Sequence, residues 1–281
     1  MERLFGCHVS GAGGLVNALK NGMELKVNSI QIHPSPPQKW ISKPFTKGVE
    51  DEFNTHKPNS GITKVFFHGI YLINLANPDP QKFHLSKMSL VHYLDLISRI
   101  KGDGVIFHVG SMKDQEDEAE GYKQIISGVN WILEESPNSG RLLLEVAAGS
   151  GKVIGSRMEE LARIYEGVKD GERVAFALDS QHMWASGYDL RSDTDSIVKD
   201  VERVFGLDKV QAIHLNDSKT ELASKKDRHE NLGKGLIGEE ALKRFINHPK
   251  LKKIPFILET PALKEMQSAK PEVEHLRALI A

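Results

Sequence analysis

Histidine and carboxylate side chains stand at the ends of short apolar runs along this chain of 281 residues. His68 ends the run Lys64–His68, for example, and Asp179 ends the run Val174–Asp179. Such groups are costly to bury unless they are paired or bind a metal, and imidazole with carboxylate but no thiolate suits zinc, manganese or iron. Nine side chains of this kind predict a site for divalent metals: His68, His108, Glu145, Asp179, His182, His214, Asp227, His229 and Glu259.

Each of these side chains also has an ordinary alternative role. A carboxylate at the end of a strand is often the N-cap of the following helix, and a single histidine there is more often a hydrogen-bonded polar residue than a ligand. The joint pattern favours metal binding, because six consecutive apolar runs, the third to the eighth, each end in a group that can ligate a metal. We expect the histidines outside these motifs to be solvated: His56, His84, His92, His248 and His275.

The number of candidate ligands exceeds what one ion needs. At about three to four protein ligands for each ion, the set would hold two or three ions. Two metals about 3.5–4 Å apart can stabilise both the attacking and the leaving oxygen of an in-line displacement. The cluster therefore favours hydrolysis of a phosphate ester.

Eight apolar runs of strand length must position these side chains. Most of the runs are continuous rather than alternating, as expected for parallel strands that are buried on both faces. They cover residues 4–9, 29–33, 64–68, 105–108, 142–146, 174–179, 210–215 and 255–259.

Stretches with helical periodicity separate the runs. Leu90, Leu94 and Ile97, for example, recur at the spacing of one helix face. The most polar of the predicted helices covers residues 50–59. Eight strands that alternate with helices predict an α/β fold, a single (β/α)₈ TIM barrel that forms one domain over residues 1–281. In such barrels the active site lies at the carboxyl ends of the strands, where the candidate ligands stand.

The composition indicates the cellular location of the protein but does not identify its substrate. The 37 basic and 38 acidic side chains almost cancel, so the chain lacks the basic signature of many nucleic-acid binders. Bound metals add local positive charge, however, so DNA is not excluded as a partner. Cys7 is the single cysteine, which predicts a reducing, cytoplasmic setting. No run of 18 apolar residues occurs, so we expect no membrane partner, and nothing in the sequence demands an oligomer, so we expect a monomer.

Several motifs occur in order on this barrel pattern. Residues 187–191 read Gly-Tyr-Asp-Leu-Arg, residues 214–217 read His-Leu-Asn-Asp, and residues 227–229 read Asp-Arg-His. With these motifs the chain resembles the endonuclease IV family, the zinc-dependent apurinic/apyrimidinic endonucleases, over essentially its full length. All nine of the family's ligand positions are filled here.

The resemblance implies three zinc ions, with manganese as an alternative at one or more of the sites. It assigns His68, His108 and Glu145 to the first ion. Glu145 would also bridge to a second ion, would orient the attacking water, and is the expected catalytic residue. The second ion would be completed by Asp179, His214 and Glu259, and the third ion would be held by His182, Asp227 and His229. The implied reaction is hydrolysis of double-stranded DNA 5′ to abasic sites, which leaves a 3′-hydroxyl and a 5′-deoxyribose phosphate.

Four side chains are candidate contacts to DNA. Tyr71 matches a family residue that lies near the DNA, although a core aromatic is an equal alternative for it. Arg228 lies in a lysine-rich loop after the seventh run, where it could contact the phosphate backbone. Lys39 and Trp40 lie in the loop after the second run.

The chain departs from the family outside the ligands. Many members carry Asn-x-Arg-x-Trp in the loop before Trp40, and here Gln38 stands in place of the arginine. Lys39 could supply a charge there but not a planar guanidinium. After Glu145 the family usually has Asn-Thr, and here Val146 and Ala147 follow. Polar groups behind metal ligands tune affinity and activity by about 10–100-fold, so these departures predict altered DNA kinking or rate.

Two alternatives stay open. A sugar isomerase or epimerase of the same barrel superfamily would need one metal and about four ligands, which Glu145, Asp179, His214 and Glu259 alone would satisfy. The other five candidate ligands argue against it, because an isomerase does not need them. The second alternative is a catalytically silent barrel that binds metal or abasic DNA without incision.

Overall fold

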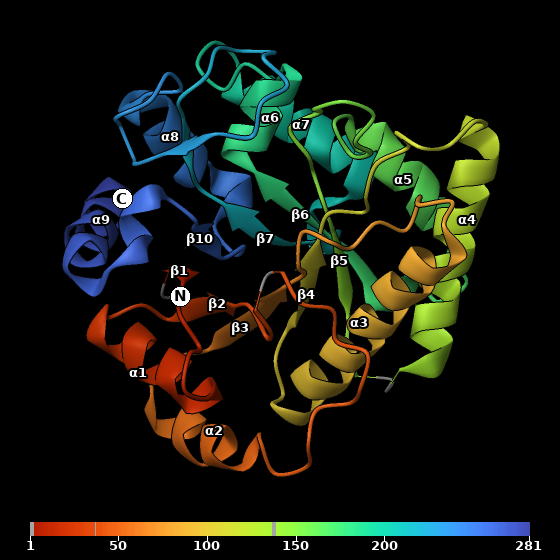
Figure 1. Cartoon of the computed structure of the whole chain (residues 1–281). Helices are drawn as coiled ribbons and strands as arrows, with labels where there is room; N and C mark the ends of the chain where they lie inside the picture. Colours follow the sequence, from red (N-terminus) through yellow and green to blue (C-terminus); the bar gives the residue numbers. More distant parts are fainter. Residues whose placement is uncertain (1–2, 37, 137–138) are drawn as a thin grey trace.

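Eight parallel strands close into a barrel in this computed structural model, which describes residues 3–36, 38–136 and 139–281. Neighbouring strands in the barrel follow the chain order, with β10 closing the ring between β7 and β1. Figure 1 shows the helices arranged around the outside of the strands. The predicted α/β TIM barrel is therefore confirmed. The barrel strands are β1 Phe5–His8, β2 Ser29–Ile32, β3 Lys64–His68, β4 Gly104–Phe107, β5 Leu142–Glu145, β6 Val174–Asp179, β7 Val210–His214 and β10 Phe256–Leu258.

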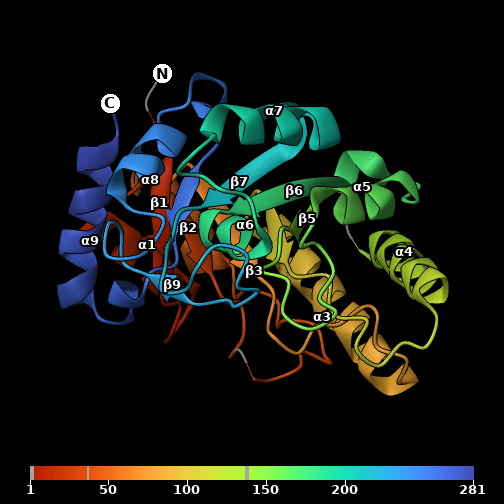
Figure 2. The same cartoon turned by 90° about the horizontal axis from the view of Figure 1, so that it is seen from above.

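Helices connect successive strands and cover the outside of the barrel, as Figure 2 shows from a second direction. Within the described residues they are α1 Leu15–Glu24, α2 Asp51–His56, α3 Pro80–Arg99, α4 Glu118–Glu135, α5 Met158–Glu166, α6 Ser180–Ser186, α7 Thr194–Phe205, α8 Glu239–Ile246 and α9 Met266–Leu279. Short 3₁₀ turns add η1 Lys57–Asn59, η2 Gly171–Arg173, η3 Leu207–Lys209, η4 Pro249–Leu251 and η5 Pro261–Lys264. In the part of the chain that the structure describes, no helix is long and apolar enough to cross a bilayer.

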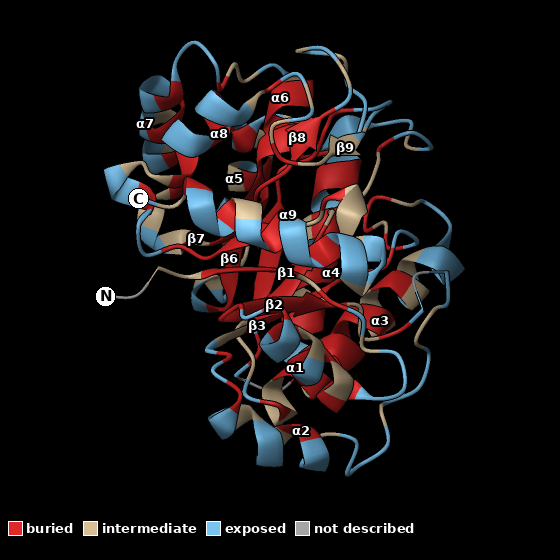
Figure 3. Cartoon of the chain, turned by 90° about the vertical axis from the view of Figure 1, so that its left-hand side faces the viewer, coloured by how far each residue is buried: buried red, intermediate tan, exposed pale blue. Residues whose placement is uncertain are grey.

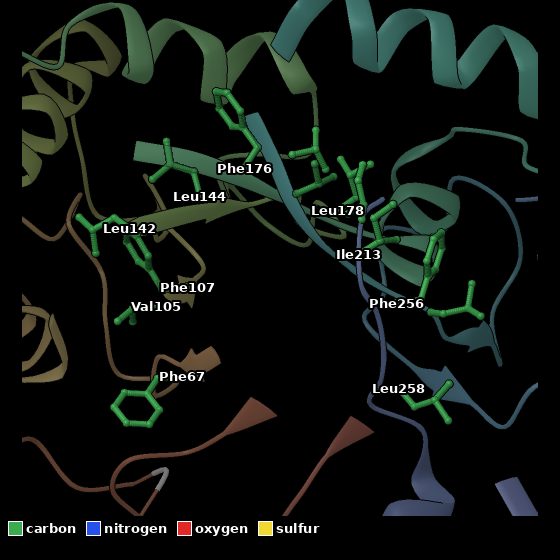
Figure 4. Packing of buried hydrophobic residues seen from close by; sticks show 14 of the residues in the cluster. Phe67, Val105, Phe107, Leu142, Leu144, Phe176, Leu178, Ile213, Phe256 and Leu258 are labelled. Carbon is green, nitrogen blue, oxygen red and sulfur yellow. The ribbon is translucent and has the colours of Figure 1, made fainter. Parts of the chain in front are cut away.

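The core has two layers because successive residues of a strand face opposite sides of the sheet. Side chains such as Phe67 and Phe107 lie between the strands and the surrounding helices (Figure 4). Their neighbours Phe66 and Ile106 belong to a separate cluster of buried residues inside the barrel. Figure 3 shows the strands buried on both faces and the helices buried along one side, which explains why the strand segments read as continuous apolar runs.

The local sequence explains where several helices begin. Asp79 caps α3 by accepting hydrogen bonds from the backbone N–H groups of Gln81 and Lys82, and Pro80 occupies the first turn. Asp117 caps α4 in the same way. The polar segment 50–59 is helical as predicted, as α2 followed by η1, and it buries the ring of Phe53.

Two elements were not predicted from the sequence. Helix α6 lies directly after β6 and is buried on all sides except at its last residue, so it has no polar face to give a helical pattern. A two-stranded antiparallel sheet pairs β8 Asp217–Ser218 with β9 His229–Glu230 in the loop after β7. Strands of two residues are too short to produce a recognisable period.

Candidate metal centre

The nine candidate ligands lie together at the mouth of the barrel, seven of them at or just after the carboxyl ends of strands and Asp227 and His229 in the loop after β7. Three groups of ligand atoms are close enough for their members to share an ion. The groups are His68, His108 and Glu145; Glu145, Asp179, His214 and Glu259; and Asp179, His182 and His229. Glu145 and Asp179 each belong to two groups, so the three groups form one continuous cluster.

The first group is centred on one oxygen of Glu145. The Nε2 atom of His68 lies 3.0 Å from Oε2 of Glu145, and Nε2 of His108 lies 3.5 Å from the same oxygen. Glu145 is the last residue of β5 and is fully buried. Two imidazole nitrogens from β3 and from the residue after β4 therefore converge on a carboxylate that water does not reach.

The second group surrounds Nδ1 of His214, at the end of β7. This atom lies 2.7 Å from Oε1 of Glu145, 3.4 Å from Oε2 of Glu259 and 3.8 Å from Oδ2 of Asp179. His214, Glu145 and Asp179 have no exposed surface. Three carboxylates facing one buried nitrogen need a positive charge among them, which either a metal ion or a protonated His214 supplies.

The third group differs from the assignment that the resemblance implies. Asp179 joins His182 and His229, with its Oδ2 atom 3.7 Å from Nε2 of His229. Asp227 lies at the outer side of the same pair, 3.4 Å from Nε2 of His182 and 3.3 Å from Nε2 of His229. Its side chain is half exposed, whereas that of Asp179 is buried.

Asp179 also fills the ordinary role that a carboxylate at a strand end can have. Its Oδ1 atom accepts a hydrogen bond of 2.9 Å from the backbone N–H of His182 and so caps α6. Its Oδ2 atom accepts a hydrogen bond of 2.7 Å from the side-chain amide of Asn216 and faces the histidines. The N-cap role and the candidate ligand role therefore use different oxygens.

Backbone carbonyls fix the orientation of three of the histidines. The Nδ1 atoms of His68, His182 and His229 donate to the carbonyl groups of Gly69, Val146 and Glu259, at 2.8, 3.0 and 3.2 Å. A carbonyl oxygen only accepts, so each Nδ1 must carry a hydrogen and each Nε2 atom is left for a ligand role. In His108, by contrast, Nδ1 is buried and has no partner in the described part of the chain.

Charges within the cluster shift its pKa values strongly. Burial would raise the pKa of Glu145, but His108, His214 and His182 hold that pKa well below its usual range. Burial would lower the pKa of His214, but Glu259, Glu145 and Asp179 raise it to about 9. Glu145 is therefore charged, and the buried imidazole of His214 is held as a cation when no metal replaces its proton.

The donor set fits divalent metals on three counts. It combines imidazole nitrogens with carboxylate oxygens and contains no thiolate, as zinc, manganese and iron sites do. Its buried carboxylates are paired with histidine, because among the described residues no lysine or arginine forms an ion pair with Glu145 or Asp179. The fixed orientation of its histidines is typical of metal ligands.

A cavity of about 780 Å³ opens above the cluster. Its walls include candidate ligands such as His108 and Glu259, together with Tyr71, Lys219 and Lys264. His8 and His33 also line it, with ring centroids 4.4 Å apart. A volume of this size is sufficient for a nucleotide-sized ligand.

The candidate DNA contacts do not all reach this cavity. Tyr71 lines it with 75% of its surface exposed, so the alternative of a core aromatic is wrong for this residue. Lys39 and Arg228 are exposed, and Trp40 packs partly against the core. These three are not among the described residues that line the cavity. In the loop after β2, whose sequence differs from the family pattern, Pro37 lies outside the described residues.

Sequence reasoning missed two buried amides. Gln31 lies within β2, which like β1 has no candidate ligand at its end, and its side chain contacts His214, Glu259 and His8. Asn216 donates to Asp179 and accepts a hydrogen bond from the backbone N–H of Glu259 at 2.9 Å. The available signal for Gln31 was a large polar side chain between two isoleucines of the buried run Ser29–Ile32.

Known proteins resemble the chain in both sequence and structure. The family model described as "Xylose isomerase-like TIM barrel" matches residues 19–279. A "Probable endonuclease 4" of Alkaliphilus oremlandii is 34% identical, with 97% of this chain and 95% of the relative covered. Another from Halothermothrix orenii is 37% identical, with 91% of this chain and 92% of the relative covered.

Solved structures also resemble this chain, and the endonuclease among them resembles it more than the epimerase-like protein does. The crystal structure of endonuclease IV from Thermus thermophilus superposes with a TM-score of 0.87 at 29% identity and covers 99% of this chain and 98% of that chain. A D-tagatose 3-epimerase-like protein superposes with a TM-score of 0.72 at 16% identity, covering 98% of this chain and 96% of that one. The second likeness shows the shared fold alone.

Proposed function

The chain belongs to the endonuclease IV family of DNA-repair nucleases, within the xylose isomerase-like TIM barrels, and we propose on that premise that it incises double-stranded DNA at abasic sites. The bond hydrolysed is the phosphodiester 5′ to the abasic nucleotide, and the products are a 3′-hydroxyl and a 5′-deoxyribose phosphate. The observation that carries the proposal is the continuous cluster of three ligand groups at the floor of one cavity.

The cluster would hold three zinc ions, with manganese as the alternative at one or more positions. We assign His68, His108 and Glu145 to the first ion, and Asp179, His214 and Glu259 with Glu145 to the second. His182, Asp227 and His229 would hold the third, and the short distances around Asp179 support a shared role for it. When bound, the ions supply Lewis-acid stabilisation of charge on the phosphate and activation of water at neutral pH.

Glu145 is the residue that we propose as catalytic. One of its oxygens faces His68 and His108, and the other faces His214, so this carboxylate joins the first two groups. Its depressed pKa keeps it ionised. An ionised carboxylate in this position accepts a hydrogen bond from a water molecule and orients it towards the phosphorus.

The rim of the cavity supports a role in binding DNA. The exposed ring of Tyr71 stands beside it, and Lys219 and Lys264 line it. Aromatic stacking and contacts from lysine to phosphate are the usual means of holding a distorted backbone. An abasic nucleotide has no base to unstack, so its extrusion into such a cavity is inexpensive. Lys39, Trp40 and Arg228 lie outside the cavity, where they would contact the flanking duplex.

A sugar epimerase is the second candidate function. One observation favours it: Glu145, Asp179, His214 and Glu259 alone form a complete four-ligand group. The groups around His68 and His182 have no role in such an enzyme, and the likeness to epimerases is confined to the fold. We therefore prefer the nuclease.

We propose one domain over residues 1–281 that acts as a monomer, because the cluster draws on strands from β3 to β10 and is complete within one chain. The single cysteine Cys7 is buried, and we keep the cytoplasm as the proposed location.

The experiment that tests the function compares three substrates with one preparation of the protein. A labelled duplex with one abasic site should be cut, and the same duplex with an intact base should stay whole. A ketose sugar should be returned unchanged. An intact abasic duplex together with conversion of the sugar would show that the nuclease assignment is wrong and that the epimerase is right.

A further inference from the structure

A buried amide on β2, one of the two barrel strands without a candidate ligand, contacts the second ligand group. We propose that Gln31 is a positioning residue that makes His214 bind its metal through Nδ1, and that it holds Glu259 in register with that nitrogen. The inference rests on the proposed metal centre, because it concerns how one ligand of that centre is oriented.

The contacts of Gln31 determine which way its amide points. Its Nε2 atom lies within hydrogen-bond distance of Oε1 of Glu259, and its Oε1 atom lies 2.7 Å from Nε2 of His214. An ionised carboxylate only accepts hydrogen bonds, so the amide nitrogen must be the atom that faces Glu259. The amide oxygen must then face His214.

That orientation fixes the tautomer of His214. The amide oxygen of Gln31 only accepts, so Nε2 of His214 must carry the hydrogen and donate it. The lone pair of the neutral ring is then on Nδ1, the atom that lies 2.7 Å from Glu145 and 3.4 Å from Glu259. His68, His182 and His229 have the opposite arrangement, with Nδ1 donating to a carbonyl.

His214 has no backbone carbonyl in this role among the described residues, so a side chain from another strand takes it. Gln31 is fully buried and reaches His214 on β7 from β2 across the barrel mouth. Its Nε2 atom is also 3.1 Å from Nδ1 of His8. One amide therefore links side chains on β1, β2 and β7 with Glu259 after β10.

Removing the amide should weaken metal binding more than folding. In Gln31→Met the side chain keeps a similar volume but loses its acceptor for His214 and its donor for Glu259. Hydrogen bonds behind a metal ligand typically change the metal affinity by about 10–100-fold. We therefore expect the variant to lose zinc to a competing chelator at a chelator concentration about 10–100-fold lower than the parent does. Zinc for each chain is measured by elemental mass spectrometry.

Asn28→Ala is the matched control. Asn28 is a buried amide just before the same strand, and it bonds to Phe5 and Arg3 at the other end of the barrel. We expect this variant to lower the melting temperature while it holds zinc like the parent. Equal zinc affinity in Gln31→Met and the parent would overturn the inference, and so would an equal loss of zinc in Asn28→Ala.

A measurement on the parent protein tests the inference even if Gln31→Met does not fold. Nitrogen NMR of the zinc-loaded protein should show His214 with its hydrogen on Nε2 and its metal on Nδ1. The reverse arrangement would overturn the role of Gln31 and leave the proposed function standing. A parent protein that binds no zinc at all would instead contradict the proposed metal centre.

Discussion

At the scale of single residues, the candidate centre depends on how each imidazole ring is held. Three histidines are oriented by backbone carbonyls and one by the amide of Gln31. His108 has no such partner for its buried Nδ1 atom among the described residues, and Val146 and Ala147, which follow Glu145, supply no polar side chain. His108 instead approaches Glu145 through its Nε2 atom, at 3.5 Å, and its ring contacts the rings of His68 and His182.

The first prediction concerns the charge of Glu145. Glu145→Gln keeps the shape of the side chain but removes the negative charge that faces His68, His108 and His214. We expect a folded protein by circular dichroism that incises abasic DNA at least about 100-fold more slowly, because a preorganised electrostatic contact is worth about that much. Incision at the parent rate would mean that the central ligand has been misplaced.

The second prediction concerns Tyr71. Its ring is largely exposed, so Tyr71→Ala should leave the melting temperature and the zinc content unchanged. Loss of stacking against DNA costs about 1–3 kcal/mol, so KM for an abasic duplex should rise about 5- to 150-fold in steady-state incision. Met23→Ala, an exposed apolar side chain on the outer helix α1, is the control. An unchanged KM in Tyr71→Ala would exclude the stacking role.

At the scale of elements, the loop after β7 brings two candidate ligands to the cluster. Its shape depends on Asp217, a buried carboxylate in β8. The oxygens of Asp217 accept hydrogen bonds from the backbone N–H groups of Ser218, Gly235, Ile237 and Gly238. Because β8 pairs with β9, which begins at His229, the third ligand group depends on this carboxylate.

The third prediction follows from those bonds. Asp217→Asn places an N–H₂ group against backbone donors, so buried groups lose their partner at a cost of about 1–3 kcal/mol. We expect a lower midpoint in urea and the selective loss of the ion near His229, measured as about one zinc fewer for each chain. Asp103→Asn is the control, since Asp103 bonds to Lys64 and Val65 near the start of β3. Full zinc content in Asp217→Asn would show that the third ligand group does not depend on the carboxylate of Asp217.

The elements also show what could be predicted from the sequence. Parallel strands buried on both faces leave continuous apolar runs, so the strands and the positions of His68, Glu145 and Asp179 at their ends were predictable. Helix α6 was not, because it is buried nearly all round and has no polar stripe. The role of Gln31 was not predictable either. Its partners lie on β1, on β7 and directly after β10, and contacts between residues so far apart in the chain leave no local sequence pattern. The exposure of Tyr71 depended on the path of its loop.

At the scale of the whole molecule, the barrel gathers residues that are up to 191 positions apart, from His68 to Glu259, into one mouth. The formal net charge of −1 provides no general attraction to DNA. We therefore expect DNA binding to depend on local charge, from metal ions in the proposed centre and from lysines such as Lys219 and Lys264 on the rim. In the function that we propose, both recognition and hydrolysis therefore depend on the metal centre.

The most direct test of that claim follows incision and metal content together. A duplex with one abasic site is incubated with the protein as purified, after treatment with a chelator, and after zinc is restored. We expect incision to fall at least about 100-fold on chelation, to return with zinc, and to leave a 3′ end that a polymerase can extend. A metal-free protein that cuts as fast as the zinc-loaded one, or a zinc-loaded protein that leaves the abasic strand intact, would contradict the account.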